Sequence, residues 1–215
     1  MVKRINPFSV ITIGLVLVTL LAVFVALSGS VSSSGYKNFP EIYNTSGDLD
    51  RDGIPEEYTL ANYSLAISEG KNELWRTPPE WQVDRIILGD VDNDGSLNLV
   101  MTLWKTGSFG SIRPFWKNGE DQSYKNHLFV YKLHNDQFKP VWCSSDLDSP
   151  ILDLSIEDTD GDSLQELRIR EGRYQKEKDG RYRTDSNSPG RFSVWKWEEW
   201  GFRLQANPSQ ISFPN

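Results

Sequence analysis

Three acidic segments with one shared spacing constrain this 215-residue chain more than any other feature of its sequence. Each has the pattern Asp-x-Asp-x-Asp, and each carries a further side-chain oxygen four residues after the third Asp. We number the positions of each segment from its first Asp, so the aspartates stand at positions 1, 3 and 5 and the last oxygen at position 9. The segments are named loops 1, 2 and 3, and they begin at Asp48, Asp90 and Asp158.

This spacing is typical of calcium coordination. Ca²⁺ takes about six to eight oxygen ligands, and carboxylates at positions 1, 3 and 5 converge on one ion when the backbone turns sharply at position 6. Glycine favours that turn; Gly53 and Gly95 supply it in loops 1 and 2, whereas loop 3 has Ser163. Position 7 would add a main-chain carbonyl and position 9 a side-chain oxygen. The predicted ligands are Asp48, Asp50, Asp52, Ile54 and Glu56 in loop 1, Asp90, Asp92, Asp94, Ser96 and Asn98 in loop 2, and Asp158, Asp160, Asp162, Leu164 and Glu166 in loop 3.

Two alternatives compete with this interpretation. A single acidic segment is often an Asx turn with solvated carboxylates, but three copies with the same offsets favour a metal. An EF-hand needs a Glu at position 12 and a helix on each side. Position 12 is Thr59, Met101 or Ile169, and apolar residues alternate with period two beside the loops, which predicts strands. We therefore expect hairpin loops that bind about three Ca²⁺ per chain, nearly cancelling the net charge of −7.

The alternating pattern predicts three groups of four strands. The loops start 42 and 68 residues apart, and a four-stranded blade takes about 40–50 residues, so the second repeat carries an insertion at about residues 105–126. Residues 178–190 are polar and bounded by Gly and Pro, which predicts a loop between the second and third strands of the last group. The predicted strands are 41–43, 57–60, 64–68 and 73–76; then 83–88, 97–104, 127–133 and 138–143; then 151–156, 166–171, 191–197 and 202–205.

The acidic repeats resemble the FG-GAP repeats of integrin-type β-propellers and their bacterial relatives, the VCBS-like repeats. The resemblance covers about residues 36–206. It implies an all-β, β-propeller-like array of about three four-stranded blades, with a calcium-binding loop between the first two strands of each blade. Closed propellers usually have about four to eight blades. Three blades leave open an open fan, a small ring, or part of a ring completed by self-association or by a partner that covers the exposed edge strands.

The N-terminal segment 8–27 is almost wholly apolar. Twenty helical residues span the ~30 Å hydrocarbon core of a membrane. Lys3 and Arg4 precede the segment and no charge follows until Lys37, so the positive-inside rule places the N-terminus in the cytoplasm. We expect a single-pass signal anchor in the cell membrane; the alternative is a cleaved signal peptide and a secreted protein. The predicted organisation is a cytoplasmic N-terminus 1–7, a transmembrane anchor 8–27, a flexible Gly/Ser-rich linker 28–35, an extracytoplasmic repeat domain 36–206 and a C-terminal tail 207–215.

Composition narrows the function. Acidic residues outnumber basic ones, 30 to 23, and no Lys/Arg cluster appears, which argues against nucleic-acid binding. Two histidines and one cysteine offer little for catalysis, and no catalytic residue is predicted. Loops carry function more often than scaffolds do, so Phe115 and Trp116 in the insertion are predicted to contact a protein or glycan ligand.

These observations together predict a membrane-anchored, extracytoplasmic, calcium-binding module for binding or adhesion, and not an enzyme. One alternative is an accessory protein or enzyme of cell-envelope polymer metabolism, because residues 126–154 are faintly similar to repeat domains that accompany capsule or poly-γ-glutamate synthesis proteins. Another is a purely structural subunit of an envelope complex.

Overall fold

The computed structural model describes residues 42–110, 114–116, 118 and 121–206. The predicted N-terminus 1–7, anchor 8–27, linker 28–35 and tail 207–215 lie outside these residues. Within the described ranges, no helix has the length and apolar character needed to cross a membrane. This part of the chain forms fourteen strands and no helix, so the prediction of an all-β fold is confirmed for it.

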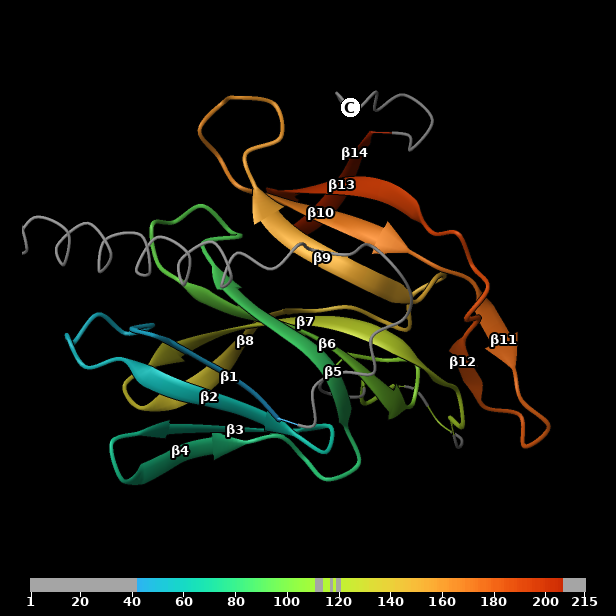
Figure 1. The fold of residues 1–215 in the computed structure, drawn as a ribbon, viewed down its shortest axis with the longest axis horizontal. Coiled ribbons are helices and arrows are strands. Elements are labelled where there is room, and N and C mark those ends of the chain that lie inside the picture. Colours follow the sequence, from blue (N-terminus) through green and yellow to red (C-terminus); the bar gives the residue numbers. More distant parts are fainter. Residues whose placement is uncertain (1–41, 111–113, 117, 119–120, 207–215) are drawn as a thin grey trace, which may run out of the picture. The chain divides into compact units, whose positions relative to one another are not determined.

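Twelve of the strands form three four-stranded antiparallel sheets, and each sheet follows the order of the chain (Figure 1). All twelve overlap the predicted strands. Sheet 1 contains β1 (Ile42–Gly47), β2 (Glu56–Ala61), β3 (Ser64–Glu69) and β4 (Asn72–Arg76); sheet 2 contains β5 (Gln82–Gly89), β6 (Asn98–Thr106), β7 (Tyr124–His134) and β8 (Gln137–Cys143); sheet 3 contains β9 (Ile151–Glu157), β10 (Glu166–Glu171), β13 (Arg191–Glu198) and β14 (Gly201–Ala206).

The remaining two strands, β11 (Tyr174–Lys176) and β12 (Tyr182–Thr184), form a small hairpin between β10 and β13. The prediction of a loop over residues 178–190 is therefore wrong at β12. Tyr174 holds the hairpin against sheet 2: its hydroxyl donates to the Leu147 carbonyl at 3.0 Å, accepts from the Asn126 amide at 3.2 Å, and its ring meets Trp104 edge-on. These contacts lie far away in sequence, so local polarity gave no sign of them.

Sheet 2 lies between sheets 1 and 3 (Figure 1) and takes part in two hydrophobic cores. Successive side chains of a strand point to opposite faces. On β6, Leu99, Met101 and Leu103 pack in the core shared with sheet 1, whereas Val100 packs in the core shared with sheet 3. This double burial explains why β6 and β7 are almost continuously buried along their length.

A glycine directly before each of the first two loops sets the contact between sheets. A Cβ atom added to Gly47 would lie 2.7 Å from Leu88 Cδ1, and one added to Gly89 would lie 2.5 Å from Ile156 Cδ1. Leu88 and Ile156 occupy equivalent places, two residues before the first Asp of the next loop. The contact between sheets 1 and 2 is thus repeated between sheets 2 and 3.

The two ends of the stack depart from this pattern in complementary ways. Two residues before its loop, sheet 1 has the exposed Ser46. Sheets 2 and 3 have an apolar residue there, which packs against the glycine of the preceding sheet. Sheet 3 has Glu157 where sheets 1 and 2 have that glycine, and Glu157 forms an ion pair with Arg168 at 3.6 Å. Polar residues at the outer positions are typical of capping repeats in stacked arrays.

Substitution of Gly89 by alanine tests this sheet-to-sheet contact. We expect Gly89→Ala to lower the free energy of unfolding by about 1–3 kcal/mol, because the added methyl overlaps Ile156 Cδ1. The double variant with Ile156→Val, which lacks that atom, should recover part of the loss relative to the two single variants. Urea unfolding measures both. Additive effects of the two substitutions would contradict the contact.

Candidate metal centres

Each acidic loop joins the first and second strands of its sheet. Loop 1 connects β1 to β2, loop 2 connects β5 to β6, and loop 3 connects β9 to β10. The prediction of hairpin connections is confirmed in all three places. The antiparallel strands bring position 1 and position 9 of each loop to the two sides of one hairpin, so residues eight apart in sequence face one site.

The three loops have the same backbone form. Positions 4 and 6 both take left-handed conformations in every loop. Ser163 makes the turn that glycine makes in loops 1 and 2, at a cost of roughly 1–2 kcal/mol for a residue with a Cβ atom. The φ angles are 65°, 56° and 81° at Arg51, Asn93 and Gly161, and 92°, 86° and 68° at Gly53, Gly95 and Ser163.

Three hydrogen bonds recur in each loop and orient its acidic side chains. In loops 1, 2 and 3 the position 6 amide donates to the position 1 carboxylate at 3.1, 2.7 and 2.9 Å. The position 7 amide donates to the position 5 carboxylate at 2.7, 2.9 and 2.9 Å. The position 2 amide donates to the position 9 side chain at 2.9, 2.8 and 2.9 Å. Each bond fixes one oxygen of a side chain.

Carboxylates in each loop converge closely enough to share one ion. In every loop, three of them offer oxygens that lie within 4.8 Å of one another. Two ligands of one Ca²⁺ are at most about 5 Å apart, given bonds of about 2.3–2.6 Å. The loops could therefore each hold a metal ion, whereas calcium as its identity stays a prediction. The groups are Asp48, Asp50 and Glu56; Asp90, Asp92 and Asp94; and Asp158, Asp160 and Glu166.

Loop 1 contains a buried carboxylate oxygen without a donor. Glu56 is fully buried, and its Oε2 accepts from the Leu49 amide at 2.9 Å and from the Tyr58 hydroxyl at 3.2 Å. Its Oε1 has no hydrogen-bond partner among the described residues, and neither has Asp48 Oδ1. Burial raises the pKa of Glu56, and the charge of Asp50 adds to the effect. An unpartnered buried carboxylate is costly, and a bound cation would remove that cost.

Loop 2 has a lysine beside its carboxylates. Lys132 from β7 extends into the loop, with its Nζ 2.8 Å from Asp92 Oδ2 and in contact with Asp94 Oδ2. The hydrogen bond from Lys132 lowers the pKa of Asp94. Asn98 at position 9 is fully buried; its Oδ1 accepts from the Val91 amide, and its Nδ2 has no partner. An amide nitrogen is not a calcium ligand. Asn98 could therefore coordinate an ion only through Oδ1, which already accepts the hydrogen bond from Val91.

Loop 3 also has a lysine. Lys196 from β13 places its Nζ 3.6 Å from Asp160 Oδ2, 3.4 Å from the buried Glu166 Oε1, and in contact with Asp162 Oδ2. The hydrogen bond from Lys196 lowers the pKa of Asp162. The same three carboxylates were predicted as ligands.

The sheet register explains why only loop 1 is without a lysine. Glu166 pairs with Lys196 across β10 and β13. Extending the β6–β7 register by one residue places Lys132 opposite Asn98, and extending the β2–β3 register places Glu69 opposite Glu56. Partial desolvation, followed by the nearby charges of loop 1, raises the pKa of Glu69. Sequence reasoning missed all three residues because each lies on the third strand of its sheet.

Loops 2 and 3 are also joined to each other. The Asn93 side chain donates to the Gln165 carbonyl at 3.1 Å and accepts from the Gln165 amide at 2.6 Å. Asn93 stands at position 4 of loop 2 and Gln165 at position 8 of loop 3. The two loops therefore form one connected edge of the stack.

The predicted ligand contacts Phe115 and Trp116 lie between β6 and β7. Their side chains are 92% and 65% exposed, and their rings meet edge-on with centroids 4.9 Å apart. Trp200, at the turn between β13 and β14, is 82% exposed. The structure thus leaves this aromatic pair accessible, and ligand binding by it stays a prediction.

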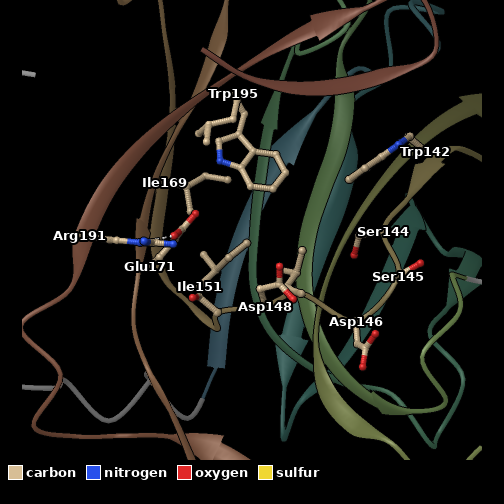
Figure 2. A pocket seen from close by; sticks show the side chains of 13 residues that line it. Trp142, Ser144, Ser145, Asp146, Asp148, Ile151, Ile169, Glu171, Arg191 and Trp195 are labelled. Carbon is tan, nitrogen blue, oxygen red and sulfur yellow. Dashed lines mark hydrogen bonds and ion pairs between the residues drawn. The ribbon is translucent and has the colours of Figure 1, made fainter. Parts of the chain in front are cut away.

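A pocket of about 380 Å³ lies beside sheets 2 and 3 (Figure 2). Two of its carboxylates are held by neighbours: Glu171 accepts from Arg191 at 2.8 Å and from Ser193 at 2.9 Å, and Asp146 accepts from Ser123 at 2.9 Å. Sequence patterns did not predict the pocket, because its walls come from distant segments. The labelled lining residues are Trp142, Ser144, Ser145, Asp146, Asp148, Ile151, Ile169, Glu171, Arg191 and Trp195.

A scan against protein-family models finds no match to this chain, and a search of curated proteins finds no significant match either.

His127 on β7 lies in the protein interior. It is fully buried, and its Nδ1 lies 3.3 Å from the Ser144 carbonyl oxygen. Burial, together with the positive charge of Lys105, lowers the pKa of His127 from 6.5 to about 4. The residue is therefore neutral in the folded protein at pH 5–7, and its surroundings fit a structural role.

The lowered pKa of His127 predicts a pH-dependent stability. Below pH 6.5 His127 binds a proton in the unfolded chain but not in the folded chain. The free energy of unfolding therefore falls as the pH drops from about 6.5 to about 4. His127→Asn should remove this part of the pH dependence, whereas the exposed His134→Asn should not. Urea unfolding between pH 7 and 5 measures the slopes. Parallel curves for the parent chain and His127→Asn would contradict the prediction.

Proposed function

We propose that this chain is a calcium-stabilised, β-propeller-like binding module that acts outside the cytoplasm. One observation carries the metal part of the proposal: the buried Glu56 in loop 1 has an unpartnered carboxylate oxygen, and it forms a group with Asp48 and Asp50 that could hold a metal ion. The same backbone geometry recurs in two further loops, so it is a property of the repeat.

The donor set favours calcium among metal ions. Each group consists only of Asp and Glu, and oxygen ligands suit hard cations. Mg²⁺ usually keeps several waters and needs one or two carboxylates, whereas Ca²⁺ accepts several carboxylates and carbonyls in a flexible loop. The predicted anchor 8–27 would place the loops where calcium modules typically bind with Kd of about 10⁻⁴–10⁻³ M.

The sheet arrangement supports the predicted kinship with FG-GAP and VCBS-like repeats. In each sheet the acidic loop lies between the first two strands, as that family's blades have it. Ser46 and Glu157 at the outer positions support an array that ends after three blades. We therefore favour an open three-bladed array over a fragment of a larger ring.

Binding is a better match to the exposed features than catalysis. Phe115 and Trp116 present an accessible aromatic surface of the kind that stacks on sugar rings or packs on a protein partner. In the pocket, Glu171 is neutralised by Arg191 and held by Ser193, so it is placed for structure or binding. A role in envelope-polymer metabolism or as a purely structural subunit is the alternative.

Substitution of Glu56 tests the metal site. Calcium should raise the melting temperature of the parent chain, since an ion that binds only the folded form at a hundredfold excess over Kd adds about 2.7 kcal/mol. Glu56→Gln should lose much of this gain, yet match the parent or exceed it in EDTA, because the amide replaces a buried, unpartnered carboxylate. The exposed neighbour Glu57→Gln is the matched control. Equal destabilisation of Glu56→Gln in calcium and in EDTA would argue against coordination.

Substitution of Trp116 tests the binding surface. We expect Trp116→Ala to weaken binding to immobilised cell-wall glycans or surface proteins at least tenfold, because it removes the larger ring of the exposed pair. Trp200→Ala removes a more exposed indole elsewhere and should leave binding unchanged. A glycan array and surface plasmon resonance measure the effect. Similar losses from both substitutions would point to nonspecific aromatic adhesion.

A further inference from the structure

We propose that the three loops are unequal calcium sites: loop 1 is the primary site, while Lys132 and Lys196 act as tethered cations that stabilise loops 2 and 3 without metal and weaken their calcium binding. This inference rests on the proposed function in one respect, that the loops bind calcium.

In the part of the chain that the structure describes, no positively charged side chain is paired with the three grouped carboxylates of loop 1. Asp48, Asp50 and Glu56 form no ion pair with a lysine or arginine among the described residues. The loop's own Arg51 extends away, since its guanidinium lies 3.8 Å from the Cβ position of Gly95 in loop 2. Glu69, at the place of the lysines, adds a further negative charge beside the site. The loop thus needs a cation from solution.

Loops 2 and 3 contain that cation already. The side chains of Lys132 and Lys196 are only 21% and 17% exposed, so both are drawn into the loops rather than extended into water. Lys132 contacts the carboxylates of positions 3 and 5, and Lys196 contacts those of positions 3, 5 and 9. These are the predicted calcium ligands, so a calcium ion competes with the ammonium group for the same oxygens.

The side chain at position 9 also makes the three loops unequal. In loop 1 the free Glu56 Oε1 is available to an ion. In loop 2 the corresponding atom is the amide nitrogen of Asn98, which repels a cation. In loop 3 the corresponding Glu166 Oε1 faces Lys196. Only loop 1 offers position 9 without a competitor.

Calorimetric titration of Ca²⁺ into the EDTA-stripped full chain tests the inference. We expect one site that binds at least tenfold more tightly than the others, and Asp50→Asn should abolish it. Lys132→Met should strengthen one weak site about tenfold, which corresponds to about 1.4 kcal/mol. Lys139→Met is the matched control, because Lys139 pairs with Lys132 across β7 and β8 and is exposed.

A transplanted lysine keeps the test decisive if Lys132→Met folds poorly. Glu69→Lys places the ammonium group of loops 2 and 3 in loop 1. It should weaken the tight site at least tenfold and raise the melting temperature in EDTA, whereas Glu69→Gln should do neither to that extent. Three sites of equal affinity, insensitive to these lysines, would overturn the inference and leave the calcium proposal standing. Absence of calcium binding would overturn both.

Discussion

The convergence of carboxylates at one edge of each sheet is the constraint on which the rest of this structure depends. In the hairpin between the first two strands of each sheet, oxygens of three acidic side chains lie within 4.8 Å of one another. Like charges at that distance oppose closure. Main-chain amides relieve part of the repulsion by binding one oxygen at positions 1, 5 and 9. A cation, from solution or from a lysine, would relieve the repulsion among the remaining oxygens.

The loops and the packing of the sheets are physically coupled. Gly47 and Gly89 stand directly before loops 1 and 2, and a Cβ atom on either would overlap an apolar side chain of the next sheet. Asn93 and Gln165 then tie loop 2 to loop 3. A change in the charge balance of one loop therefore acts at the same edge where the sheets contact each other. Sheet 2 contributes to both cores, so it is packed against both of its neighbours.

Local sequence patterns predicted what local physics decides. Period-two alternation was sufficient for the twelve strands of the three sheets, and the repeated aspartates were sufficient for the hairpin loops. The small hairpin of β11 and β12 was not predicted, because Tyr174 is held by Leu147 and Asn126 and not by its sequence neighbours. The contacts of the two lysines with the loops were not predicted for the same reason. Lys132 lies 38 residues after Asp94, and Lys196 lies 34 residues after Asp162, so only the sheet register brings them to the loops.

The unequal charge balance also has a consequence for the proposed calcium binding. Loops 2 and 3 carry their own cations and are bound to each other, so sheets 2 and 3 have what they need to stay closed without metal. Loop 1 has neither advantage, and it is joined to β1, whose side chains are mostly exposed. Segments with few buried contacts open at the lowest free energy. If loop 1 binds calcium as proposed, removal of the ion would open the β1–β2 hairpin first, and sheet 1 would be the calcium-responsive end of the stack.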